Sequence, residues 1–126
     1  MTQPSETPYQ SLERIFHEPN RLAIMSALGG AVDGLIFTEL KEQCNLTDGN
    51  LSRHLKALDE ARAINIQKTF VGARPRTTVY LTDAGRASFV SYLQNLEVVL
   101  RHAAESITTE HRTSTLLDGL QGPVGA

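Results

Sequence analysis

The fold is decided by the stretch Thr47-Asp48-Gly49-Asn50-Leu51-Ser52-Arg53-His54-Leu55-Lys56-Ala57-Leu58. Leu51, Leu55 and Leu58 recur at i, i+4 and i+7, so they form one apolar stripe along a helix. At about 100° per residue, Arg53 and Lys56 point away from that stripe. The stretch therefore predicts an amphipathic helix that buries its leucines and presents a polar, cationic face to solvent.

The polar face of this helix carries side chains that suit double-stranded DNA. Arg53 and Asn50 are predicted to contact base edges, because a guanidinium can grip guanine and an amide can grip adenine with two hydrogen bonds each. Ser52 and Lys56 are expected to touch phosphates, which set the register of a protein without reading sequence. His54 lies beside the leucine stripe, so it either packs there or contacts a phosphate.

A second helix is expected just before this one. Thr38 can cap a helix that ends near Asn45, and Thr47 or Asp48 can cap the next helix, at about residues 48–62. Two helices joined by so few residues form a helix-turn-helix.

Two strand-like runs, residues 64–70 and 77–81, follow this motif and predict a hairpin. The segment between them is too long for a tight turn and carries Arg74 and Arg76. These two arginines are expected to reach an adjacent minor groove or its backbone. Lys68 assists from the preceding strand.

The chain before the motif is expected to begin with a flexible arm. Residues 1–8 hold two prolines and little that can be buried. Apolar side chains then recur at helical spacing from Leu12 to Gly29, which predicts one helix, or two if the helix breaks at Pro19. Residues 35–37 form a short apolar run that can pair as a small strand.

The last helix is predicted over residues 82–107, with Thr82 as its cap and a tail over residues 108–126. Such a helix spans about 39 Å at ~1.5 Å per residue, which exceeds what a small domain needs to cover its own core. Its apolar residues advance by four and three, as in a coiled-coil seam. We therefore predict a homodimer formed through this stripe, against the simpler reading that it covers its own domain. The predicted contacts are Phe89, Tyr92, Leu93, Leu96, Val99, Leu100, Ala103 and Ile107.

Composition is consistent with one compact domain, over residues 9–107. A chain of 126 residues with 40% hydrophobic content can bury one modest core. The formal net charge is -2, yet six basic and only two acidic residues lie between Leu51 and Arg76. A basic face on an acidic body can hold phosphates locally.

Other classes of function find little support in the sequence. Cys44 is the only cysteine, and neither a signal segment nor a membrane-length apolar run occurs, so we expect a cytoplasmic protein without a membrane partner. His102 and Glu105, with His111 nearby, are too few ligands for a metal, so no metal and no cofactor is predicted. The chain has no glycine-rich phosphate loop and no nucleophile elbow, so it is not expected to be an enzyme.

The order helix, strand, helix, helix, hairpin, long helix is that of a winged helix, a mainly α fold with a small β-hairpin. Two blocks, residues 50–61 and 81–86, lie on either side of the Arg-Pro-Arg segment and together resemble prokaryotic winged helix-turn-helix transcriptional regulators of the MarR and ArsR type. The likeness covers roughly residues 12–107. Arg62 departs from it, because such regulators commonly have a glycine just after the helix.

The resemblance implies a dimeric repressor or activator that binds a palindromic operator. Its two recognition helices would lie in successive major grooves, about 34 to 36 Å apart, with the wing, residues 71–77, at the minor groove or backbone. A small-molecule effector between the last helix and the DNA-binding part is left open. The alternative is a winged helix that serves as a protein-interaction module and binds a different protein through its last helix.

Overall fold

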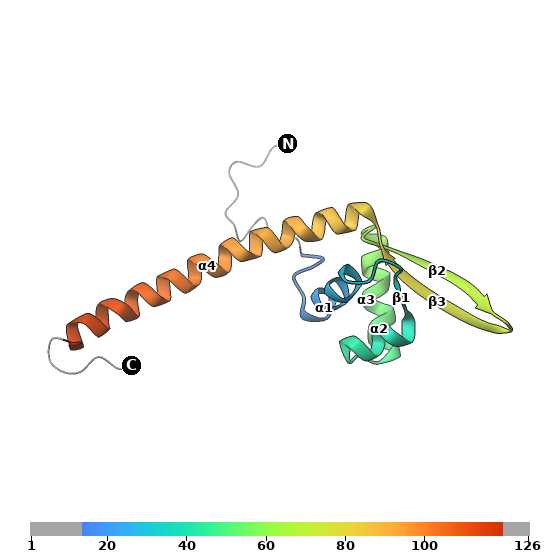
Figure 1. The fold of residues 1–126 in the computed structure, drawn as a ribbon, viewed down its shortest axis with the longest axis horizontal. Coiled ribbons are helices and arrows are strands. Elements are labelled where there is room, and N and C mark those ends of the chain that lie inside the picture. The colour runs from blue at the N-terminus through green and yellow to red at the C-terminus, as the bar shows by residue number, and fades with distance from the viewer. Residues whose placement is uncertain (1–13, 120–126) are drawn as a thin grey trace.

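The computed structural model describes residues 14–119, and side chains for residues 14–109. Within this range the helices and strands follow in the order α1 (Pro19–Gly29), β1 (Leu35–Ile36), α2 (Phe37–Cys44), α3 (Asp48–Glu60), β2 (Ile64–Val71), β3 (Arg74–Leu81) and α4 (Asp83–Gly119). Helices α1 to α3 gather into one body, while the β2–β3 hairpin and α4 project from it in different directions (Figure 1). The predicted winged helix with a long last helix is confirmed.

The core lies between the three short helices, the inner face of the sheet and the first turns of α4. All three leucines of the predicted stripe on α3 are buried, which confirms the side of α3 that faces inward. Burying one such side chain stabilises a fold by roughly 1.5–3 kcal/mol. Among residues 14–109, the buried apolar residues are Phe16, Ile24, Met25, Leu28, Leu40, Leu51, Leu55, Leu58, Ala63, Ile64, Val79, Phe89 and Tyr92.

The sheet has the strand order β1-β3-β2, with antiparallel pairing throughout. Ile66 and Leu35 both pair with Val79, one from each side, so the buried end of the hairpin is held in the core. β1 pairs only through Leu35 and Ile36, and the outer half of β3 has β2 as its only partner among the described strands.

The hairpin turn is tighter than the sequence predicted. The strands continue to Val71 and resume at Arg74, so the prediction of a loop too long for a tight turn is wrong. Gly72 has a φ of +64°, which suits a two-residue hairpin turn. Pro75 misled the sequence interpretation, because proline usually interrupts a strand. It pairs with Phe70 beyond the end of β1, so its missing N–H deprives no third strand of a partner.

The starts of the first two helices both differ from what the sequence predicts. α1 begins at Pro19, where the sequence left a break open, and residues 14–18 are not helical, whereas Leu12 lies outside the described residues. α2 begins at Phe37 with Ile36 as its N-cap residue, so the prediction that Thr38 caps it is wrong. The carboxylate of Glu39 accepts a hydrogen bond of 3.0 Å from the Ile36 backbone N–H instead.

The turn between α2 and α3 follows local side-chain chemistry. α2 ends at Cys44, and Asn45 adopts a left-handed conformation with φ of +52°, which asparagine tolerates well. Of the two predicted caps for α3, Thr47 is the one in place, because its hydroxyl accepts a hydrogen bond of 3.2 Å from the Asn50 N–H. The helix ends at Glu60, close to the predicted end.

Arg62 forms the corner after α3 in a conformation usually given to glycine, with φ of +61°. Its backbone N–H donates to the carbonyl of Asp59, and the N–H of Ala63 donates to that of Leu58, both at 2.9 Å. This pair of bonds is a Schellman motif, which normally has glycine at this position. The chain therefore makes the same turn as its resemblance implies, with a side chain that strains it.

Thr82 fastens this corner to the start of α4. Its hydroxyl donates a hydrogen bond of 2.7 Å to the Arg62 carbonyl and accepts one of 2.8 Å from the Gly85 N–H, so it caps α4 as predicted. Gly85 lies so close to Ala63 that a Cβ atom there would overlap the Ala63 backbone. The start of α4 is thus locked onto the exit of α3.

α4 differs from its prediction at both ends of the apolar stripe. Phe89 and Tyr92 are buried in the core of their own protomer, with ring centroids 5.4 and 5.7 Å from that of Phe16, so they are not free for a second copy. The helix also continues to Gly119 instead of ending near Ile107. No described helix is both long and apolar enough to cross a membrane.

Candidate DNA interface

The exposed surface of α3 carries the predicted contacts. Asn50, Ser52, Arg53 and Lys56 are all exposed, whereas the leucines of the same helix are buried. Nη2 of Arg53 lies 3.5 Å from Oδ1 of Asn50, in a long hydrogen bond between the two predicted base readers. The face therefore offers a guanidinium fork and an amide one helical turn apart.

An ion pair across the turn helps to orient α3. Nζ of Lys41 on α2 lies 2.9 Å from Oδ1 of Asp48, at the first position of α3. Both side chains reach solvent, so the pair contributes at most about 1 kcal/mol to stability. A carboxylate at the start of a helix also interacts favourably with the positive end of the helix dipole.

His54 does not belong to this exposed face. It is 4% exposed and lies between α3 and α1, with Nδ1 3.4 Å from Nη1 of Arg21 and 3.7 Å from Oε2 of Glu18. Arg21 can only donate, so a hydrogen bond between these two nitrogens requires an unprotonated Nδ1. The predicted contact of His54 with DNA is therefore withdrawn in favour of packing, the alternative that the sequence left open.

Burial is the main cause of a lowered pKa at His54. The nearby carboxylate of Glu18 raises the pKa of this imidazole, but burial and the cations of Arg53 and Arg21 outweigh it. Nε2 of His54 is buried without a hydrogen-bond partner in the described part of the chain. A neutral His54 is thus part of the support behind α3. Sequence reasoning missed Glu18 and Arg21, because nothing local in the sequence links them to His54.

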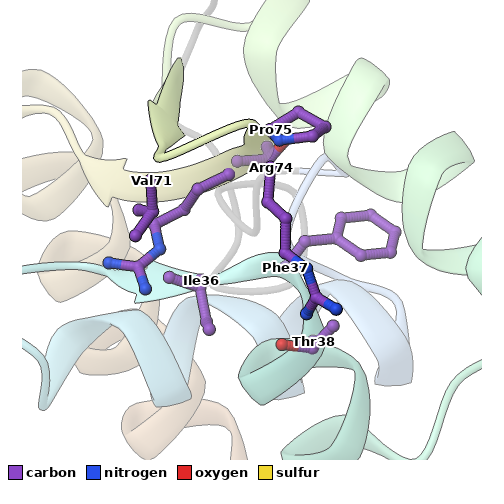
Figure 2. Close-up of a pocket in the computed structure, with 8 residues that line it drawn as sticks. Ile36, Phe37, Thr38, Val71, Arg74 and Pro75 are labelled. Carbon is purple, nitrogen blue, oxygen red and sulfur yellow. The ribbon is translucent and has the colours of Figure 1, made fainter.

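The basic side chains of the hairpin lie on two different surfaces. Lys68 lines a groove between β2 and α3, together with Ser52 and Lys56. Arg74 and Arg76 line a separate hollow of about 550 Å³ at the outer half of β3. In Figure 2 this hollow has Val71, Arg74 and Pro75 of the hairpin on one side, and Ile36, Phe37 and Thr38 at the start of α2 on the other.

The described residues contain no cluster of side chains that could hold a metal ion. Within them, no group of three or more histidine, cysteine or acidic side chains comes together. His102 and Glu105 share one open hollow on α4, and the side chain of His111 lies outside the described range. The chemistry that the surface offers is hydrogen bonding and cationic charge, spread over α3 and the hairpin.

A helix-turn-helix with a cationic outer helix, followed by a hairpin that carries arginines, defines the winged helix class of nucleic-acid-binding proteins. The comparison with known families agrees with this geometry. The family model described as "Winged helix DNA-binding domain" matches residues 20–100, and the chain belongs to this family.

Similar proteins come from archaea and bacteria. An uncharacterized protein of Methanocaldococcus jannaschii is 36% identical over 83 residues, which cover 66% of this chain and 89% of the relative. A transcriptional regulator homologue protein from Pyrococcus horikoshii OT3, whose structure is solved, is 30% identical in sequence. The structural match has a TM-score of 0.67 and covers 72% of this chain and 89% of the Pyrococcus chain. The S. aureus MepR–DNA complex has the same fold, with a TM-score of 0.62, 17% identity and coverage of 86% and 87%.

These findings confirm the predicted class. The resemblance to prokaryotic winged helix regulators holds, and the family is one of DNA-binding regulators of transcription and not of enzymes. The individual DNA contacts and the homodimer stay predictions.

Proposed function

We propose that two copies of this protein bind a palindromic operator, with each α3 in a major groove, and that they regulate transcription there. The observation that carries the proposal is the exposed pair of Asn50 and Arg53 on α3, a helix whose leucines are buried in the core. The presence of DNA in the MepR complex, whose fold is similar, supports DNA as the ligand by analogy. A chromosomal duplex as ligand is also consistent with the expected cytoplasmic location.

The contacts are assigned by reach and by chemistry. Arg53 and Asn50 read base edges, because both can form paired hydrogen bonds in the major groove. Ser52 and Lys56 hold phosphates beside them. Lys68 faces the same groove between α3 and the hairpin, so it extends this cationic surface towards the wing.

Arg74 and Arg76 act from the wing as anchors. Both are exposed near the end of the hairpin, which projects from the body (Figure 1). Long cationic side chains at such a position reach the backbone or the minor groove next to the site that α3 reads. They strengthen binding to every sequence and contribute little to base preference.

The second copy is proposed to pack along α4. Leu93, Leu100 and Ile107 follow each other at intervals of seven residues and are 40%, 59% and 69% exposed. Val99 and Ala103 flank this seam. Exposed apolar residues at heptad spacing are typical of a coiled-coil contact. α4 also extends well past α1 to α3, so this part of its surface is open to a partner (Figure 1).

An apolar hollow of about 290 Å³ between α1 and the start of α4 is the proposed place for an effector. Phe89, Val90 and Leu93 line it, and Arg86 lies at its edge. A small apolar ligand there would touch both the seam and the DNA-binding body, so it could change how the two copies pack and thereby the spacing of their α3 helices. A screen for compounds that raise the melting temperature and shift operator affinity tests this assignment.

The function is tested by gel mobility shift with duplexes that the wild-type protein selects from a random pool. Arg53→Ala should weaken binding and relax base preference, and the double change Arg74→Ala/Arg76→Ala should weaken binding to all duplexes. Arg101→Ala is the matched control, because it removes the same charge from α4, where Arg101 pairs with Glu97 at 2.8 Å. DNA binding that none of these changes affects would overturn the mechanism and favour a protein-interaction module.

A further inference from the structure

Phe70 is the large apolar side chain that the fold leaves most exposed on the hairpin. It is 74% exposed, two residues before Gly72 of the turn, and it takes no part in the core. Its cross-strand partner is Pro75, so the outer end of the hairpin is apolar on this face. An aromatic ring that is this exposed contributes little to the stability of the fold, which favours a role in binding.

Strand alternation fixes the direction in which Phe70 points. Side chains at every second position of β2 share a face, so Phe70 lies on the side of Ile64, Ile66 and Lys68. Ile64 and Ile66 pack inward, and Lys68 lines the groove shared with α3. Phe70 therefore continues the α3-facing surface of the hairpin, one step farther out than Lys68. Val71 has the opposite orientation and lines the hollow with Arg74.

The charged residues near Phe70 indicate what kind of molecule this end of the hairpin binds. Residues 64–81 contain Lys68, Arg74 and Arg76 and no acidic residue. A cationic hairpin with an apolar end suits a polyanion whose groove has an apolar interior. DNA minor grooves meet this description, and proteins that bind them insert Phe, Leu or Pro between base steps while cations hold the phosphates.

We propose that Phe70 is an apolar wedge that enters the minor groove beside the site read by α3 and partly unstacks one base step. The inference rests on the proposed function, since it requires that α3 and the hairpin lie on the same duplex. Lys68, Arg74 and Arg76 hold the phosphates on either side of the wedge. Steps that unstack easily, such as TA and CA, are then favoured in the flanking minor groove although no hydrogen bond reads them.

The test uses a duplex selected by the wild-type protein, with 2-aminopurine placed at one flanking step at a time. Binding of the wild type should raise the fluorescence at one step, because the base there loses its stacking partner. Phe70→Ala should abolish this rise and weaken affinity about tenfold, because the ring no longer buries its apolar surface between the bases. Phe70→Leu should keep much of both. Val71→Ala, a change at a neighbouring exposed apolar residue on the other face, should behave as wild type.

The outcomes separate this inference from the proposed function. If Phe70→Ala keeps the fluorescence rise and the affinity while Arg53→Ala loses affinity, the wedge is wrong and the function stands. The wedge is also overturned if Val71→Ala loses as much as Phe70→Ala, or if Phe70→Ala lowers the mass of the protein in sedimentation equilibrium, which would assign the ring to a protein contact. A wild type that selects no duplex overturns both proposals. Unchanged melting temperatures confirm that each variant folds.

Discussion

Arg53 and Asn50 lie one turn apart on α3, joined by a hydrogen bond from the guanidinium to the amide oxygen at 3.5 Å. At this length and on an exposed surface the bond contributes little to stability. In the proposed complex with DNA, the two side chains would start beside each other, and side chains that are partly ordered in advance lose less conformational entropy on binding.

The first prediction separates the fork of Arg53 from its charge. Arg53→Lys should cost about 1 to 3 kcal/mol on the preferred operator, because lysine cannot form the paired bonds to guanine. The slope of affinity against salt should stay as in wild type, since the charge is kept. Fluorescence anisotropy with single-base operator variants measures both quantities. Equal base preference in Arg53→Lys and wild type would assign Arg53 to phosphate contact.

A second prediction concerns the seam on α4. Leu100→Glu should raise the dissociation constant of the dimer about a hundredfold or more, because two carboxylates would meet where two leucines pack in the proposed dimer. Leu100 is 59% exposed in the protomer, so the variant should fold normally. Gln94→Glu adds the same charge at an exposed position off the seam and is the control. Sedimentation equilibrium reports the masses, and a Leu100→Glu protein that stays dimeric removes α4 from the interface.

The third prediction follows from the lowered pKa of His54. The folded protein disfavours the protonated imidazole, so the unfolded chain binds more protons below the ordinary pKa of 6.5. The free energy of unfolding should be fully retained above about pH 6.5 and should fall as the pH drops below it. His54→Asn keeps an acceptor for Arg21 and should flatten this dependence. Urea unfolding at a series of pH values shows whether the two curves differ in slope.

The fourth prediction concerns the strained corner. Arg62→Gly should raise the free energy of unfolding by about 0.5–1 kcal/mol, because glycine adopts positive φ without strain but loses more entropy on folding. Arg62→Ala, which keeps a Cβ atom, should bring no such gain. Thermal and urea unfolding of both variants decide the matter. DNA affinity should change only slightly, as expected for a single cation outside α3 and the hairpin.

Local periodicity and capping predicted most of the fold, because they reflect short-range physics. The buried stripe of α3 and the caps at Thr47 and Thr82 follow from such patterns. The tight hairpin turn does not follow from the sequence, because a proline usually interrupts a strand. Pro75 is tolerated in β3 because β1 does not extend far enough to pair with it. Phe70 had a signal in its alternation with Lys68, but the sequence does not show that the core ends before it.

Distant contacts account for two other errors. The spacing on α4 indicates an apolar stripe but not which surface covers it, so Phe89 and Tyr92 were assigned to a second copy although Phe16 packs on them. His54 likewise has an ordinary helical position, and only the fold brings Glu18 and Arg21 against it. In both cases the deciding partner comes from the segment just before α1 or from its first turn.

The aromatic contact of Phe16 with Phe89 and Tyr92 leaves α4 without a flexible joint to the body that carries α3. In the proposed dimer the protein would then work as a rigid calliper, whose opening is fixed by where the two arms cross. A slip of the arms by one heptad moves each arm by about 10 Å at ~1.5 Å per residue, or about three base pairs. The protein would then select operators by the number of base pairs between their half-sites, although no side chain contacts those intervening base pairs.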